Sequence, residues 1–148
     1  EYDVGDTHSY TMYICPDVVK FGQAAGVAQM GGTKSWFKDT WGSVPFVQMH
    51  EIGHNLRFFH SREGNLEYGD PTGFMGGAFE REEHWGRMCL NAAKTYESGW
   101  YSEHNIDIDP ELSPYIGSMV DVNSVYQRYI KEGDNVVAHI TNKEDKDM

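Results

Sequence analysis

The sequence predicts an α+β fold, and three observations support this class. Residues 10–15 alternate in polarity, are rich in β-branched and aromatic side chains, and are followed by a proline, which is typical of a strand and its end. Residues 43–56, SVPFVQMHEIGHNL, have the length and composition of a helix. Later in the chain, only short strand-like pieces appear, namely YIGSMVDV, VYQRYI and NVVAHI. We therefore expect one domain over residues 1–110 and a β-rich segment over residues 111–148, which could begin a further domain.

The helix over residues 43–56 has a suitable beginning and an apolar stripe. Ser43 can act as its N-cap, and Pro45 lies in the first turn, where the missing N–H costs no hydrogen bond. One set of residues follows the i, i+3, i+4, i+7 spacing of a core-facing stripe: Met49, Ile52, Gly53 and Leu56. We expect the opposite face of this helix to line a cleft.

Three segments flank this helix along the chain. Before it, residues 25–37 predict a second strand, suited to a sheet edge, that Gly31 and Gly32 interrupt. After it, residues 60–77 show no period and contain recurring Gly, Asp, Pro and Asn, so we expect a loop. Residues 87–97 then predict a second helix, which Gly99 would end as its C′ residue.

Composition and charge disfavour two classes of partner. The formal net charge is -11, whereas nucleic acids and anionic membranes bind cationic surfaces. Hydrophobic residues make up 39% of the chain and aromatic residues 14%, which is enough for a packed core. The longest apolar runs are far shorter than the roughly 20 residues of a membrane-spanning helix. We therefore expect neither a nucleic-acid partner nor a membrane.

The two cysteines leave two alternatives open. Cys15 and Cys89 are far apart in the sequence and form no C-x-x-C pair. In a secreted protein they would form a single disulfide, which is the interpretation we favour. Otherwise they would be two buried free thiols.

The segment MHEIGHNLRFFHS, residues 49–61, carries a candidate catalytic metal site. On a helix, His50 and His54 lie one turn apart on the same face, so both imidazoles can bind one ion. Glu51 can reach a water on that ion and act as the general base. His60 supplies a third nitrogen if the chain leaves the helix after Leu56 and turns back. Three imidazoles with an open position suit zinc best, although copper, cobalt and iron accept the same ligands.

The string H-E-x-x-H-x-x-x-x-x-H resembles that of the metzincin zinc proteases, which have H-E-x-x-H-x-x-G-x-x-H followed by a Met-turn. Downstream, YGDPTGFMGG places Met75 in a tight glycine-rich segment, as a Met-turn would. In metzincins this methionine forms a hydrophobic floor under the ligands without binding the ion. The resemblance implies three zinc ligands, His50, His54 and His60. It also implies that Glu51 is the general base and Met75 the Met-turn residue.

Among metzincins, the chain is most similar to the gametolysin family, best known from algae. The shared pieces are QMHEIGHNL, the HS that begins at the third histidine, EYGDPTGFMG, CLNAAKTYESGWYS and IDIDP, within about residues 10–110. The resemblance implies a secreted or cell-wall zinc endopeptidase that acts on extracellular or cell-wall (glyco)proteins. It further implies a twisted mixed sheet above the active-site helix and a second helix after the Met-turn. The peptide substrate would bind as an extended strand along GVAQMGGTKSW.

One position departs from the metzincin pattern. Arg57 stands where the family has a glycine that makes a left-handed turn and brings the third ligand back to the metal. We expect Arg57 to be left-handed as well, at a cost of about 1 kcal/mol. Zinc binding, which contributes on the order of 10 kcal/mol, outweighs this cost.

Two other functions compete with the endopeptidase. The chain could be a degenerate protease, a zinc-bearing binding module without turnover. A purely structural zinc domain conflicts with Glu51, because such a site fills its fourth position with a ligand and has no use for a base. Near the site, Tyr68 could donate its hydroxyl to an oxyanion, although packing is the more common role of a tyrosine.

Overall fold

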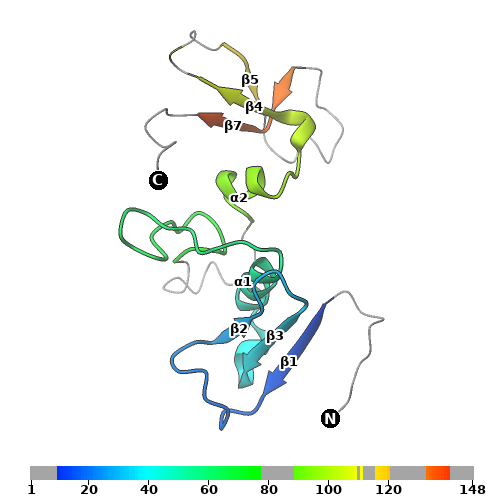
Figure 1. The fold of residues 1–148 in the computed structure, drawn as a ribbon, viewed down its shortest axis with the longest axis vertical. Helices are drawn as coiled ribbons and strands as arrows, with labels where there is room; N and C mark the ends of the chain where they lie inside the picture. Colours follow the sequence, from blue (N-terminus) through cyan, green and yellow to red (C-terminus); the bar gives the residue numbers. More distant parts are fainter. Residues whose placement is uncertain (1–9, 78–88, 110, 112–115, 121–132, 141–148) are drawn as a thin grey trace. The chain divides into compact units, whose positions relative to one another are not determined.

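The computed structural model describes residues 10–77, 89–109, 111, 116–120 and 133–140 (Figure 1). The chain forms two compact units, Glu1–Asn91 and Ala92–Met148, and each is described by itself. Both units combine helices and strands, which confirms the α+β class. The division of the sequence at residue 110 stays a prediction, and the expected strand VYQRYI lies outside the described residues.

The first unit contains a three-stranded mixed sheet with the order β1-β3-β2. Strand β1, Thr11–Cys15, runs parallel to β3, Lys34–Lys38, and β2, Gly26–Ala28, runs antiparallel to β3. The strand predicted at residues 10–15 is therefore confirmed, whereas residues 25–37 form two antiparallel strands and not one interrupted strand. The interruption at Gly31–Gly32 is the turn that joins β2 to β3, closed by a 3.0 Å bond from Gly32 N to the Gln29 carbonyl.

Helix α1, Pro45–Asn55, confirms the predicted helix, but its N-cap differs from the expected one. Ser43 is the last residue of a 3₁₀ helix, η2, Asp39–Ser43, and α1 begins after Val44 with no side-chain cap. The prediction that Ser43 caps the helix is wrong because one helix leads directly into the next. Backbone hydrogen bonds connect the two helices at Val44. Val44 N donates to the Trp41 carbonyl at 3.1 Å, and Gln48 N donates to the Val44 carbonyl at 3.1 Å. Pro45 does occupy the first helical position.

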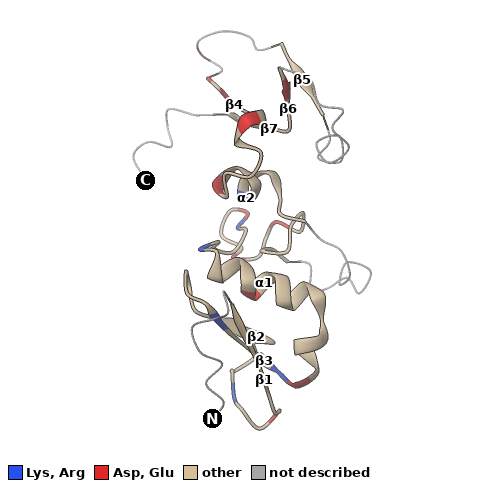
Figure 2. Ribbon diagram, turned by 90° about the vertical axis from the view of Figure 1, so that its right-hand side faces the viewer, with Lys and Arg blue, Asp and Glu red and all other residues tan. Residues whose placement is uncertain are grey.

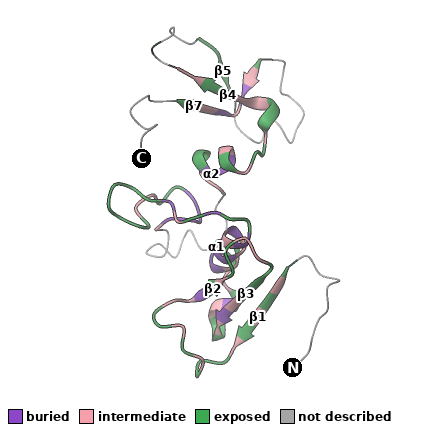
Figure 3. Ribbon diagram, viewed as in Figure 1, coloured by how far each residue is buried: buried purple, intermediate pink, exposed green. Residues whose placement is uncertain are grey.

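The expected apolar stripe of α1 is not its buried face. Met49 is 41% exposed and Leu56 39%, whereas the buried residues are Phe46, Val47, His50, Glu51, Gly53 and Asn55. The prediction failed because α1 is covered from two directions. Strands β2 and β3 pack on one side, and the loop that carries Phe74 and Met75 packs on another. Figure 3 shows buried residues gathered on α1 and on β3.

The hydrophobic core of the first unit lies between the helix, the sheet and this loop. Its buried members are Phe37, Phe46, Val47, Phe58, Phe74 and Met75. They come from one strand, one helix and the chain that follows the helix. The core therefore fixes the helix against both neighbours, and with it the direction in which His50 and His54 point.

Residues 60–77 form a loop, as predicted, and backbone bonds hold it in shape. Ser61 N donates to the Met75 carbonyl at 2.7 Å, and Asp70 N donates to the Ser61 carbonyl at 3.1 Å. The Asp70 carboxylate accepts a bond from Thr72 N at 2.8 Å and one from the Asn91 amide. The segment around Met75 is thereby tied to the residue that follows His60.

The cysteines are both free thiols, so the favoured disulfide is not formed. Cys15 ends β1, the strand at the opposite edge of the sheet from β2. The carbonyl of Cys89 accepts a bond from Phe74 N in the loop that packs on α1. The two thiols are held by different parts of the unit, which explains why they remain separate.

The described residues of the second unit form one short α-helix and two pairs of parallel strands. Helix α2, Ala92–Glu97, is shorter than the predicted helix because residues 89–91 are not helical; Gly99, with φ 70°, follows it as the expected C′ residue. A 3₁₀ helix η5, Ser102–His104, precedes the strands, which are β4, Asn105–Ile108, β5, Ser118–Met119, β6, Asp134–Asn135, and β7, Val137–Ile140. β4 pairs with β7 and β5 with β6. Across the described parts of both units, the helices are too short or too polar to span a bilayer.

Candidate metal centre

The end of α1 explains how an arginine replaces the expected glycine. Arg57 N donates to the His54 carbonyl at 3.0 Å, and Phe58 N donates to the Gly53 carbonyl at 2.9 Å. These two bonds form a Schellman motif, in which the C′ residue is left-handed. Arg57 has φ 74°, so the expected left-handed conformation is confirmed. The chain thus reverses after α1 even without a glycine.

Contacts with the β2–β3 turn stabilise Arg57 in this conformation. The Arg57 side chain lies over Gly31, where an added Cβ would be 3.0 Å from Arg57 Cγ. Gly31 N donates to the His54 carbonyl at 2.8 Å, so the same turn also supplies a hydrogen-bond donor to a carbonyl in the last turn of the helix. Packing of the aliphatic part of Arg57 offsets some of the roughly 1 kcal/mol that a left-handed residue with a Cβ costs.

Each of the three histidines donates a hydrogen bond from Nδ1 to an oxygen. His50 Nδ1 donates to the Phe74 carbonyl at 2.7 Å, and His54 Nδ1 donates to the Phe58 carbonyl at 2.8 Å. His60 Nδ1 donates to Glu67 Oε1 at 2.7 Å. When each imidazole is neutral, its one proton lies on Nδ1, and all three Nε2 atoms are left as acceptors.

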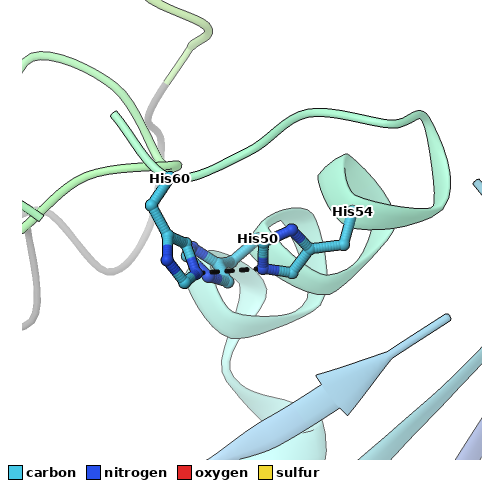
Figure 4. A group of neighbouring side chains, drawn as sticks. All are labelled: His50, His54 and His60. Carbon is cyan, nitrogen blue, oxygen red and sulfur yellow. Dashed lines mark hydrogen bonds between the residues drawn. The ribbon is translucent and has the colours of Figure 1, made fainter. Parts of the chain in front are cut away.

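These nitrogens point toward one another, as Figure 4 shows. The candidate ligand atoms of His50, His54 and His60 all lie within 4.8 Å of one another. His54 Nε2 and His60 Nε2 are 3.1 Å apart, and with both protons on Nδ1 neither of these atoms can donate to the other. A cation between the nitrogens would remove the repulsion of their lone pairs, so this donor set fits a metal ion.

The buried histidines have the protonation state that metal binding requires. Burial lowers the pKa of His50 to about 4. Burial also lowers the pKa of His54. Both imidazoles are therefore neutral at pH 7, as ligands must be.

Glu51 lies beside the histidines, in the first unit's cleft. It is 5% exposed, and burial raises the pKa of its carboxyl to about 7. It is the acidic residue of α1, the helix that Figure 2 shows lying along the sheet of β1, β2 and β3. A Cβ added to Gly26 on β2 would be 3.0 Å from Glu51 Cγ, so only glycine lets the strand approach this closely. Glu51 is thus held between the helix and the edge strand.

A hollow of about 350 Å³ opens over this group. Its lining combines β2 with the residues of the candidate site, namely Ala24, Gly26, Val27, Ala28, Met30, His50, Glu51, His54, His60 and Tyr68. A second hollow of about 270 Å³ shares His50, Glu51 and Tyr68 and adds Trp41. The three histidines and Glu51 therefore meet in one open cleft, with the edge strand along it.

Met75 lies under the helix, away from the hollow. It is 1% exposed, and a Cβ added to Gly53 would collide with its sulfur atom. The preceding residue, Phe74, supplies the carbonyl that receives His50 Nδ1. The segment expected to form a Met-turn therefore supports the helix from below and orients one of the histidines.

Two features of the site gave no usable signal in the sequence. Glu67 is seven residues from His60, and nothing in that spacing predicts their contact. The carbonyl acceptors of His50 and His54 belong to the backbone, so no residue type marks them. Tyr68, considered for its hydroxyl, does reach the hollow, and its ring centroid is 4.0 Å from that of His60.

Comparison with known protein families gives a match over most of the chain. The family described as Gametolysin peptidase M11 matches residues 4–115, which is most of the chain and includes all of the cleft residues above. The comparison with curated proteins and that with solved structures each found no match.

Proposed function

Because the chain belongs to the gametolysin family of metallopeptidases, we propose that it is a zinc-dependent endopeptidase of the metzincin type. In this proposal His50, His54 and His60 hold the zinc ion, Glu51 is the general base, and Met75 is the Met-turn residue. Family membership already implies a metal. The choice of zinc and the roles of the residues are what the proposal adds.

The observation that carries the proposal is the arrangement of the three imidazoles. Their Nδ1 atoms donate to oxygen acceptors, and one candidate ligand nitrogen of each ring lies within 4.8 Å of the others, beside an acidic side chain. A catalytic zinc site combines three protein ligands with an open position and a nearby base. A purely structural site would need a fourth ligand, and the described part of the chain offers no further His, Cys, Asp or Glu to this cluster.

The chain's own residues would divide the reaction among them. A bound zinc ion would supply Lewis acidity toward the scissile carbonyl and toward a water molecule. Glu51 would take the proton from that water and deliver it to the leaving amine. Its position between α1 and Gly26 keeps the carboxylate at the cleft rather than in solvent.

Strand β2 offers a place for the substrate. It pairs with β3 on one side, and among the described strands nothing pairs with its other edge. Gly26, Val27 and Ala28 of this strand line the hollow next to the histidines. An extended peptide could add to that edge and place a carbonyl group over the site. We propose that protein substrates bind in this way.

The substrates and the location follow from family likeness and remain proposals. The likeness to gametolysin supports a secreted or cell-wall enzyme that cleaves extracellular or cell-wall (glyco)proteins. The net charge of -11 suits neither nucleic acid nor an anionic membrane as a partner.

Metal analysis and a digest of an unfolded protein substrate test the proposal. We expect one zinc ion per chain and hydrolysis that a chelator abolishes and added zinc restores. Glu51→Gln should retain the zinc ion and lose hydrolysis, because the amide cannot accept the proton. Glu63→Gln, a change at an exposed glutamate of the loop, is the matched control and should remain active. Hydrolysis by Glu51→Gln at the wild-type rate would overturn the role of Glu51.

A second pair of variants tests the ligand set. His60→Ala should bind zinc far more weakly, while His104→Ala, which removes a histidine of the second unit, should bind like the wild type. Unchanged zinc content in His60→Ala would remove His60 from the ligand set. Wild-type chain that binds zinc but cleaves nothing would instead indicate a degenerate protease that serves as a binding module.

A further inference from the structure

The three histidines differ in how their rings are held. His50 and His54 belong to a helix, and their Nδ1 atoms donate to backbone carbonyls, those of Phe74 and Phe58. His60 lies in the loop after the helix, and its Nδ1 donates to a side chain, that of Glu67. The orientation of the third histidine therefore depends on a group that a substitution can remove.

Backbone hydrogen bonds place Glu67 opposite His60. Glu63 and Leu66 form a two-way bridge, with N–O distances of 3.1 and 3.0 Å, directly before Glu67. Asp70 N then donates to the Ser61 carbonyl at 3.1 Å, which brings the end of this turn back to the residue after His60. The Glu67 carboxylate is thus presented to His60 by a turn whose backbone is held by hydrogen bonds.

The neighbouring residue covers the face of the same ring. The ring centroids of Tyr68 and His60 are 4.0 Å apart, with 36° between the planes. Glu67 contacts the edge of the imidazole at Nδ1, while Tyr68 packs on its face. Two adjacent residues therefore restrict both the rotation and the tilt of His60.

The Glu67–His60 contact is too exposed to matter much for stability. The side chain of Glu67 is 56% exposed and that of His60 is 19% exposed. Exposed pairs of this kind add little to the free energy of unfolding, because water competes for both charged groups. In contrast, the hydrogen-bond partner of a metal-bound histidine fixes its tautomer and direction, and its loss weakens metal binding roughly 10- to 100-fold.

We propose that Glu67 is a positioning residue for the metal site: it holds the proton of His60 on Nδ1 and aims Nε2 at the position shared with His50 and His54. This inference rests on the proposed role of the three histidines as ligands. It adds a fourth residue, one that binds no metal itself, to the group that sets the affinity of the site. No sequence motif marks this residue.

Zinc affinity of the whole chain, measured by competition with a chromogenic chelator, tests this role. Glu67→Ala should bind Zn²⁺ roughly 10- to 100-fold more weakly than the wild type. Glu67→Gln keeps an oxygen that can accept the Nδ1 proton, so it should recover most of the affinity. Glu63→Ala removes an exposed glutamate four residues earlier and should bind like the wild type.

Two further readouts separate positioning from folding. The urea midpoint of the metal-free chain should be the same in Glu67→Ala and Glu63→Ala, because the exposed pair adds little to stability. The visible absorption spectrum of the Co²⁺-loaded chain should change in Glu67→Ala and not in Glu63→Ala, since it reports the geometry of the ligands.

The possible failures are distinguishable. A wild-type chain that binds no Zn²⁺ would overturn the proposed function and, with it, the role of Glu67. A wild-type chain that binds Zn²⁺, together with equal affinities for Glu67→Ala and Glu63→Ala, would overturn the role of Glu67 alone.

Discussion

Replacing Asn55 with alanine tests how α1 is tied to the strand that borders the cleft. Asn55 is 5% exposed and ends the helix. Its Nδ2 donates to the carbonyls of Gln29 and Lys34, at 2.9 and 3.1 Å, on either side of the β2–β3 turn. Its Oδ1 accepts a 2.7 Å bond from the hydroxyl of Ser35. One buried amide therefore connects the helix to β3 and to the turn that follows β2.

The expected cost of Asn55→Ala follows from these three bonds. Each contributes about 0.5–1.5 kcal/mol, so their loss amounts to about 3 kcal/mol. The two carbonyls keep a backbone donor, Gly32 N for Gln29 and Gln29 N for Lys34, so neither becomes an unsatisfied group. Alanine's higher helix propensity returns about 0.5 kcal/mol. We expect a net loss of about 2–3 kcal/mol in the free energy of unfolding.

Urea unfolding of the metal-free chain, followed by circular dichroism, measures this loss. Asn65→Ala, at an exposed asparagine of the loop, is the matched control and should change the free energy by less than about 0.5 kcal/mol. Ser35→Ala and the double variant complete a cycle, in which we expect a coupling of about 1 kcal/mol between the two side chains. A loss below about 1 kcal/mol in Asn55→Ala, or strict additivity in the cycle, would refute the reasoning.

Three further predictions concern the helix and its supporting loop. Gly53→Ala places a Cβ against the sulfur of Met75, so we expect a loss of about 1–3 kcal/mol in thermal unfolding, and an unchanged midpoint would contradict the packing. Arg57→Gly removes the left-handed Cβ and should leave the chain at least as stable in urea; a clear loss would show that packing on the β2–β3 turn outweighs the strain. For Asp70, burial raises the pKa, but hydrogen bonds lower it below the ordinary value. The stability that Asp70 provides is therefore present above about pH 4 and lost as the pH falls through its lowered native pKa. The difference in stability between wild type and Asp70→Asn should shrink when unfolding is measured from pH 5 down to about pH 3.

Local patterns were sufficient to predict most elements of the first unit. The strand at residues 10–15, the turn at Gly31–Gly32 and the proline-led helix are each encoded within a few neighbouring residues. The prediction of the buried face of α1 was wrong because hydrophobicity was taken as a guide to burial. On this helix the buried face includes His50, Glu51 and Asn55, whose polar groups are satisfied by the chain around them or face the cleft.

The prediction of the N-cap of α1 failed for a related reason. Ser43 has the residue type of a cap, but the 3₁₀ helix before α1 leaves it no place in that role. A pattern that is read one helix at a time does not contain this information. The second helix shows the same limit, since only residues 92–97 of the described residues 89–97 are helical.

By itself, the sequence determined which residues could share a metal ion. The spacing of His50 and His54 fixes them on one helical face, and a third histidine six residues later can return only through a reversal at Arg57, which has the left-handed φ that this requires. These relations involve residues close in sequence, so they can be inferred without the tertiary structure. Only the tertiary structure decided how the imidazoles are aimed. Phe74, which accepts the bond from His50 Nδ1, and Gly26, which lies against Glu51, are distant in sequence from these two helix residues, and packing alone brings them together.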